Sequence, residues 1–351
     1  MFCWESIPRT LIAPGAASPR VFRLRDGHLI AAAETARGIR VYSTADNGLT
    51  WTDAGPGSFS PDLACANPEF FELPDGEVLL AHRAIGKREN GFYTSLRVSV
   101  GCCRDGLEFR PHSVVTEYTE PDGGFRGVWE PCLGMLNGVL TCFYANDSTS
   151  VTPQQNIEYM QWNGAAWTDR TVVCDGVKHD SRDGMPVWIP LKAGGYALVI
   201  ESTHLRNRKG KHPFVIRLLY SPDGVIWSDP ADIFIPRTDG SKAGAPWIAE
   251  LDDGRIVVSF QTDEDSEIKG DRTSVMKTVI SDGSPVRELT ADKFGPAETV
   301  FDVPEGTGAL WTAVYSDPYG RELIASAGTR DGAVMKRAAE KIHEQEKDSN
   351  L

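Results

Sequence analysis

Residues 19–34 read PRVFRLRDGHLIAAAE, which is a short apolar strand, a turn and a second apolar strand. A proline begins the stretch, a glycine stands eight residues later in the turn, and an apolar run follows that glycine. This order predicts a β-hairpin, because Asp-Gly pairs favour the tight turns that join antiparallel strands. The same order recurs in residues 68–83, 131–145, 186–201 and 246–261.

The repeat extends along the whole chain. The distance from proline to glycine is eight residues in four copies and seven in one, and the copies recur at intervals of 49 to 63 residues. A sixth copy, LWTAVYSDPYGRELIASA, lacks the proline and covers residues 310–327. Six copies of one hairpin predict six similar modules.

A second type of turn recurs between the hairpins. Residues 44–51, TADNGLTW, have the form S/T-x-D-x-G-x-T-W, which is called an Asp-box. Shorter or degenerate copies occupy residues 103–109, 162–167 and 221–227. We expect these residues to be structural: the Asp accepts backbone hydrogen bonds, the Gly adopts positive φ, and the Trp packs between neighbouring sheets.

Two hairpins in each of six modules give six four-stranded sheets. We therefore predict an all-β protein, a six-bladed β-propeller of four-stranded antiparallel blades, which leaves only short and protected strand edges. The Asp-boxes together with six hairpin modules resemble the sialidase-like propellers. Residues 1–335 form the single domain of the protein, and residues 1–12, with Leu11 and Ile12, add an outer strand that closes the last blade. Residues 336–351 carry four basic and four acidic side chains and are expected to form a helical or disordered tail.

Composition restricts the partners. The 351 residues include 36 Lys+Arg and 49 Asp+Glu, a net charge of −13, which argues against nucleic acid and anionic membrane surfaces. No stretch approaches the roughly 20 apolar residues of a membrane-spanning helix. Residues 1–5 lack the features of a secretory signal, so a cytoplasmic protein with seven reduced cysteines is expected. The expected oligomeric state is a monomer.

Two rings of positions are expected at the mouth of the propeller, because the first strand of each blade begins on the face where the second ends. The first ring is the residue before each proline, namely Ser18, Asn67, Glu130, Met185, Ala245 and, by alignment, Trp311. The second ring is the residue seven after each turn glycine, namely Glu34, Arg83, Ala145, Glu201, Gln261 and Ala327.

Glu130 and Glu201 are the candidate catalytic residues, from adjacent blades and the same face. A carboxylate at the end of an apolar strand needs a partner or water, and an ion pair with a ring arginine is the structural alternative. Two carboxyl groups across a sugar-sized cleft are what glycoside hydrolysis requires. The residues expected to hold substrate share a position at the mouth: Arg20, Asn67, Arg83, Trp129, Asp147, Arg182, Gln261 and Tyr315. Tryptophans near the strand starts are expected either to stack on sugars or to pack between blades.

Three short motifs resemble glycoside hydrolase family 93, the exo-α-1,5-L-arabinanases. They are GVWEP in residues 127–131, RDGMP in residues 182–186 and the strand end VIE in residues 199–201. Residues 18–24 are similar to the first-blade arginine segment of sialidase-type propellers. The resemblance implies a retaining enzyme that releases arabinobiose from the non-reducing end of linear arabinan with two glutamates, which fall on Glu130 and Glu201.

The roles within the pair are not decided by sequence. Glu130 as nucleophile and Glu201 as acid/base is the preferred assignment, and a retaining mechanism requires about 5–5.5 Å between the carboxyl groups. A cytoplasmic member would act on imported oligosaccharides rather than on the polymer.

Two other functions stay open. An exo-sialidase needs three arginines, a tyrosine nucleophile and an acid; Arg20 and either Tyr315 or Tyr319 fit, but the other arginines are not placed. A propeller that binds glycans or protein without cleaving them is the second alternative. No cofactor or metal is expected, since the seven histidines lack metal-ligand spacing. The acidic run at residues 263–265 is compatible with Ca²⁺, although a solvated charge run is the ordinary explanation.

Overall fold

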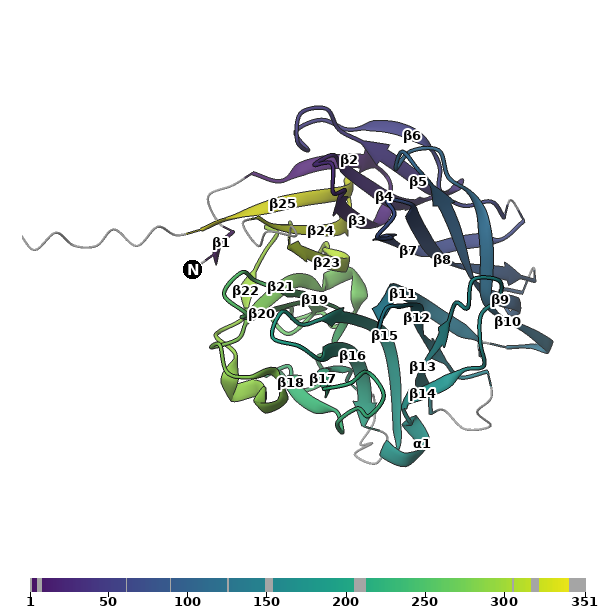
Figure 1. The fold of residues 1–351 in the computed structure, drawn as a ribbon. Coiled ribbons are helices and arrows are strands. Elements are labelled where there is room, and N and C mark those ends of the chain that lie inside the picture. The colour runs from purple at the N-terminus through teal and green to yellow at the C-terminus, as the bar shows by residue number, and fades with distance from the viewer. Residues whose placement is uncertain are drawn as a thin grey trace, which may run out of the picture.

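The computed structural model places six antiparallel sheets around a central axis (Figure 1), which confirms the six-bladed β-propeller. It describes residues 2–4, 8–60, 62–88, 90–124, 126–148, 154–204, 213–304, 306–316 and 322–340. In each blade the first strand lies nearest the axis; five sheets proceed outward in chain order, and the last one ends in strands from the N-terminus.

The first three blades contain these strands: β3 (Ala17–Arg23), β4 (Leu29–Thr35), β5 (Gly38–Ser43) and β6 (Thr52–Pro56); β7 (Ala64–Glu72), β8 (Val78–Lys87), β9 (Tyr93–Cys103) and β10 (Arg110–Gly124); β11 (Val128–Leu136), β12 (Val139–Asn146), β13 (Asn156–Gln161) and β14 (Thr171–Cys174).

The remaining blades contain these strands: β15 (Ser181–Pro190), β16 (Tyr196–His204), β17 (Val215–Ser221) and β18 (Ala231–Phe234); β19 (Ala243–Glu250), β20 (Ile256–Thr262), β21 (Val275–Ile280) and β22 (Glu298–Thr299); β23 (Leu310–Ser316), β24 (Leu323–Thr329) and β25 (Gly332–Glu340) with β1 (Phe2–Cys3) and β2 (Thr10–Pro14). The described helices are single turns: α1 (Gly176–His179), η2 (Asp271–Thr273), η3 (Val286–Glu288) and η4 (Ala291–Lys293). None of them is long and apolar enough to cross a membrane.

The N-terminal segment completes the last blade. Both β1 and β2 pair antiparallel with β25, so the ends of the chain meet in one sheet and close the ring. Strand β25 continues to Glu340, five residues into the segment expected to be a tail, because those residues pair with β24 and β1. The domain boundary expected at residue 335 therefore lies too early, and residues 341–351 are outside the described part of the chain.

A β-bulge interrupts the first strand of every blade. The pairing register shifts just after the strand starts, at the first-ring position that precedes the proline in five of the blades. Five first-ring residues have φ between 48° and 54°, namely Ser18, Asn67, Met185, Ala245 and Trp311. A non-glycine residue in this left-handed region costs about 1 kcal/mol or more, and bulges of this kind re-aim backbone and side-chain groups. Glu130 keeps negative φ, so its blade departs from the pattern.

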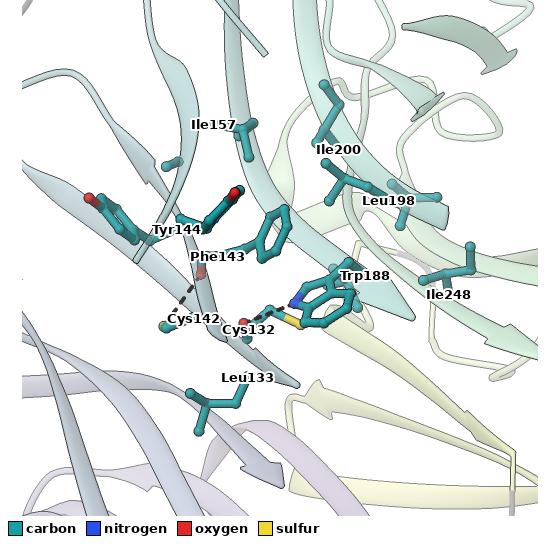
Figure 2. Packing of buried hydrophobic residues seen from close by; sticks show 14 of the residues in the cluster. Cys132, Leu133, Cys142, Phe143, Tyr144, Ile157, Trp188, Leu198, Ile200 and Ile248 are labelled. Carbon is teal, nitrogen blue, oxygen red and sulfur yellow. Dashed lines mark hydrogen bonds between the residues drawn. The ribbon is translucent and has the colours of Figure 1, made fainter. Parts of the chain in front are cut away.

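Large side chains fill the spaces between blades (Figure 2). Trp188 of blade 4 is 3% exposed and donates through Nε1 to the carbonyl of Cys132 in blade 3. Its ring lies 4.9 Å from that of Phe143. Gly134 makes room for it, because a Cβ there would stand 2.5 Å from the indole. The six cysteines whose side chains are described are buried and free, so thiols act here as core residues.

In the second type of turn, the Asp side chain accepts hydrogen bonds from backbone N–H groups of the same turn. Asp46 accepts the backbone N–H of Thr50 at 2.8 Å through Oδ1, and Gly48 has φ of 87°. Asp105 and Asp223 accept two backbone N–H groups each in the corresponding turns. Hydrogen bonds to a carboxylate lower its pKa, and the pKa of Asp46 falls to about 2.

Candidate active site

The two rings lie at one end of the propeller. In five blades the second-ring residue pairs directly with the residue that precedes the first-ring residue, as Gly184 does with Glu201. In the last blade Leu310 pairs with Gly328, so the position is one residue later than Ala327. The bulged starts of the inner strands and the ends of the second strands therefore form a common mouth.

Glu130 is held by an arginine of the preceding blade. Arg83 Nη1 donates to Glu130 Oε1 at 3.3 Å, and both side chains are 17% exposed. Burial raises the pKa of Glu130, while the guanidinium groups of Arg83 and Arg182 oppose the rise. The ion pair expected as the structural alternative is thus present, and the charge of Arg83 favours the ionised form of this half-buried carboxylate.

Trp129 and Asp147 support this pair from the side. Arg83 lies over the Trp129 ring at 5.1 Å, and Trp129 donates through Nε1 to Asp147 Oδ1 at 2.9 Å. The same oxygen accepts the N–H of Gly127 at 2.7 Å. These contacts fix the indole under the guanidinium, so the structure brings Arg83, Trp129, Asp147 and Glu130 together.

Glu201 sits in a cradle of two glycines. A Cβ on Gly244 would stand 2.6 Å from Glu201 Oε2, and one on Gly184 would stand 3.3 Å from Oε1. Oε2 accepts the N–H of Ala245 at 2.9 Å. No described residue donates to Oε1, so a proton carried by this carboxyl belongs on Oε1.

The two glutamates act on each other. Burial raises the pKa of Glu201 to about 7; the Ala245 N–H opposes this, and the charge of Glu130 adds to the rise. Arg182, whose guanidinium lies 5.6 Å from the Phe214 ring, lowers the pKa of both glutamates. Arg83 thus favours the ionised form of Glu130, whereas Glu201 is protonated below neutral pH.

The Glu201 contact with Ala245 belongs to a set that we call the interblade clips. In each clip a second-ring side-chain oxygen accepts the N–H of the positive-φ first-ring residue in the next blade. The clips are Glu34 with Asn67 at 2.7 Å, Glu201 with Ala245 at 2.9 Å and Gln261 with Trp311 at 2.7 Å. A buried N–H needs such an acceptor, so the second ring has a structural role in three blades.

Asn67 and Gln261 both belong to clips, but they differ in whether their side-chain oxygen is already bonded. Gln261 is 6% exposed, and its Oε1 is engaged by Trp311. Asn67 is also 6% exposed, but its Oδ1 is buried without a hydrogen-bond partner and lines a narrow space beside Glu130. Asn67 therefore keeps an unused acceptor near the carboxylate pair, whereas Gln261 does not.

Arg20 and Tyr315 line the central channel, and Arg20 also borders the narrow space beside Glu130. Arg20 is 4% exposed, donates to the carbonyls of Pro19 and Trp311, and lies 4.3 Å from the Trp247 ring. Burial lowers its pKa to about 10. Tyr315 lies near the far end of β23, where its hydroxyl donates to the Arg23 carbonyl. Both border a cavity of about 380 Å³ along the axis, so the structure separates Tyr315 from the glutamates.

The sequence did not single out several groups that shape the site. Gly244 and the Ala245 N–H hold Glu201, and neither carries a chemically distinctive side chain. Glu34 ends an apolar run as Glu201 does and was placed in the same ring, which was the available signal. Glu69, 7% exposed in the channel with its pKa raised by burial to about 8, follows its proline directly.

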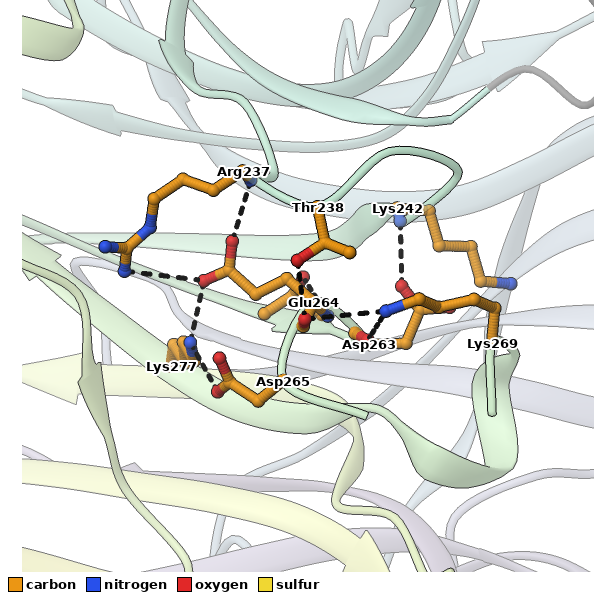
Figure 3. Close-up of polar contacts among 9 residues, drawn as sticks. Arg237, Thr238, Lys242, Asp263, Glu264, Asp265, Lys269 and Lys277 are labelled. Atoms are coloured by element: carbon orange, nitrogen blue, oxygen red, sulfur yellow. Dashed lines mark hydrogen bonds and ion pairs between the residues drawn. The ribbon is translucent and has the colours of Figure 1, made fainter. Parts of the chain in front are cut away.

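Two residues of the acidic run at residues 263–265 are buried, and Asp265 is exposed (Figure 3). Asp263 and Glu264 are 2% and 6% exposed. Lys277 places its ammonium 2.7 Å from Glu264 and 2.6 Å from Asp265. Asp263 accepts the N–H of Lys242 at 2.8 Å. Lys277 thus pairs with two of the three carboxylates, and no group of three or more candidate ligands for a metal occurs in the described chain.

Solved structures share this fold over nearly the whole chain. An α-L-arabinanase from Penicillium chrysogenum, solved with arabinobiose, matches with a TM-score of 0.72 at 19% identity over 97% of this chain and 98% of that chain. The GH93 α-L-arabinofuranosidase of Fusarium graminearum, also with arabinobiose, gives 0.73 at 18% over 95% and 97%. The chain has the fold of the glycoside hydrolase family 93 propellers.

A Dyadobacter fermentans protein of unknown function matches similarly, with a TM-score of 0.69 at 13% identity over 96% and 98% of the two chains. The sequence matches no family model and no curated protein sequence. The resemblance to family 93 is therefore confirmed in the fold, and the chemistry has to be argued from the site.

Proposed function

We propose that this protein is a retaining glycoside hydrolase that releases arabinobiose from the non-reducing end of linear α-1,5-arabino-oligosaccharides. The observation that carries the proposal is the pair Glu130 and Glu201, half-buried at one mouth and both acted on by the charge of Arg182. The arabinobiose complexes of the structures with the same fold support the substrate class.

The electrostatics favour distinct roles for the two glutamates. Glu130 is stabilised as a carboxylate by Arg83, which suits a nucleophile. Glu201, whose pKa is raised to about 7, suits a general acid, and its Oε1 is free to reach a leaving oxygen. This agrees with the assignment preferred from sequence.

The reaction then follows in two steps. Glu130 attacks the anomeric carbon while Glu201 transfers its proton to the glycosidic oxygen, so the bond to the leaving sugar breaks and a glycosyl ester forms. Water then enters, Glu201 takes a proton from it, and the oxygen displaces Glu130 from the anomeric carbon. A retaining mechanism predicts about 5–5.5 Å between the two carboxyl groups.

The deciding experiment compares Glu130→Gln and Glu201→Gln with the wild type on linear α-1,5-arabinotriose and arabinotetraose. Each variant is expected to lower kcat by about 10³-fold or more, because one step loses its nucleophile or its acid. Glu201→Gln keeps an oxygen for the Ala245 N–H, so a purely structural clip predicts little change. The control is Glu158→Gln, a carboxylate buried in blade 3 against Tyr144 and Asn146.

Azide distinguishes the two roles. With Glu130→Ala, azide replaces the nucleophile and should yield a glycosyl azide of inverted anomeric configuration. With Glu201→Ala, azide attacks the ester and should yield the retained configuration. Identical stereochemistry in both would contradict the assignment, and binding of arabinobiose without turnover by the wild type would favour a glycan-binding propeller instead.

A further inference from the structure

A cavity of about 880 Å³ opens at the mouth between blades 1 and 2. Glu34, Arg37, Arg83 and Lys87 line it, together with Phe59 and Ser60. Arg83 also bonds Glu130, so the cavity adjoins the carboxylate pair through one shared side chain. Its size exceeds what one pentose needs and suits a longer oligosaccharide.

The charge of this lining is opposite to that of the whole molecule. Three cations border the cavity in a protein of net charge −13. In the part of the chain that the structure describes, no carboxylate forms an ion pair with Arg37 or Lys87; Lys87 Nζ lies over the Tyr93 ring at 5.9 Å. Glu34, the one acidic residue of the lining, has Oε1 engaged by the N–H of Asn67.

Two guanidinium groups here keep buried donors without partners. Arg83 Nε is buried and unbonded, although its Nη1 reaches Glu130. Arg97 donates from Nη2 to Ser60 in the cavity wall at 2.6 Å, while its Nε is likewise buried and unbonded. Buried donors without acceptors are uncommon, and a guanidinium recognises a carboxylate with two parallel hydrogen bonds.

We propose that this cavity binds the carboxylate of an acidic sugar unit joined to the arabino-oligosaccharide that the enzyme cleaves. The three lining cations supply the charge, Arg83 links the bound unit to Glu130, and Phe59 offers an aromatic face. The inference rests on the proposed function for its place in the reaction. The carboxylate binding itself is tested without turnover, so the carboxylate site and the proposed hydrolase activity can be contradicted independently.

Calorimetry would measure binding of methyl galacturonoside and of its neutral counterpart, methyl galactoside, to the wild-type protein at low salt. The acidic sugar is expected to bind at least 10-fold more tightly, and added salt should weaken it because the attraction is between charges. Methyl N-acetylneuraminoside forms a third arm, because a sialic acid carries the same group. Preference for it would support the carboxylate site and identify the source of the carboxylate as sialate.

The variant Arg37→Gln with Lys87→Gln should abolish the preference for the acidic sugar, while binding of arabinobiose stays within about twofold. A surface control is Arg104→Gln, at an arginine of blade 2 that is 63% exposed and pairs with Asp75. Equal binding of the acidic and neutral sugars, or an unchanged preference in the double variant, would overturn the inference. A wild-type protein that prefers the acidic sugar but releases no arabinobiose would instead count against the proposed function.

Discussion

Glu201 and Glu34 occupy the same position of the repeat, and each accepts the N–H of a strained residue in the next blade. What separates them is their surroundings. Glu201 lies between Gly184 and Gly244, close enough to Glu130 for that charge to raise its pKa. The hydrogen bond from the Ala245 N–H thereby fixes Glu201 Oε2 and leaves Oε1 available to transfer a proton.

Gly244→Ala is predicted to impair catalysis without unfolding the protein. The new Cβ would stand 2.6 Å from Glu201 Oε2, and the mobile carboxyl group can move away while the backbone stays. Misplacing a catalytic group by about 1 Å lowers the rate by about 10²-fold. Kinetics with urea unfolding would check this against Gly295→Ala, where the nearest atom is 3.6 Å away. A large loss of stability with unchanged kcat would contradict it.

The pH profile tests the roles of the pair. Glu201 must be protonated to donate, so kcat/KM should fall as pH rises through about 7. Glu130 must be ionised, and Arg83 lowers its pKa, so Arg83→Gln should shift the acidic limb to higher pH and narrow the profile. If the acidic limb does not move in this variant, Arg83 does not lower the pKa of Glu130 and the prediction is wrong.

At the scale of elements, the bulge near the start of an inner strand turns one N–H toward the neighbouring blade in three of the blades. The clips satisfy these groups and so join blade 1 to 2, blade 4 to 5, and blade 5 to 6. Between blades 2 and 3 the second ring provides Arg83 instead, which donates to Glu130. Glu130 thus lies where an ion pair replaces the clip, and Glu201 lies in a clip.

Glu34→Ala is predicted to lower the free energy of unfolding by about 1–3 kcal/mol, because it leaves the buried N–H of Asn67 without an acceptor. Glu34→Gln keeps an oxygen there and should stay within about 0.5 kcal/mol of the wild type. Urea unfolding of both variants measures the difference. Equal losses would show that charge, not the clip, is what Glu34 contributes.

At the scale of the whole molecule, inner strands from all six blades enclose the central channel. Trp247 stacks on Arg20, and Glu69 accepts the N–H of Leu133 at 2.9 Å from the next blade. A carboxyl group held so far from water is protonated near neutral pH, as its pKa of about 8 indicates.

The wild type is predicted to lose stability relative to Glu69→Gln as pH rises from about 4.5 to about 8. The folded pKa lies above the unfolded value, so the stabilisation is complete below the unfolded pKa and lost as pH passes the folded one. Urea unfolding at pH 5, 6, 7 and 8 measures the difference between the two proteins. Parallel stabilities across this range would mean that Glu69 ionises in the fold as it does in the unfolded chain.

The sequence by itself determined the number of blades, the hairpin in each and the ring positions of Glu130 and Glu201. These depend on local rules of turn chemistry and strand alternation, which each repeat states again. The sequence did not predict the end of β25, which depends on its pairing with β1. It also did not predict that Lys277 would pair with the acidic run, because that contact forms only in the folded chain.

Tertiary structure alone decided the surroundings of the glutamates. The Gly244 cradle, the Arg83 ion pair and the displacement of Tyr315 into the channel each join residues distant in sequence. A pKa depends on burial and on charges within a few ångströms, and both arise only when the ring closes. The repeat therefore specifies which positions lie at the mouth, and the packing of the six blades specifies which of the residues there have the pKa and the partners that catalysis requires.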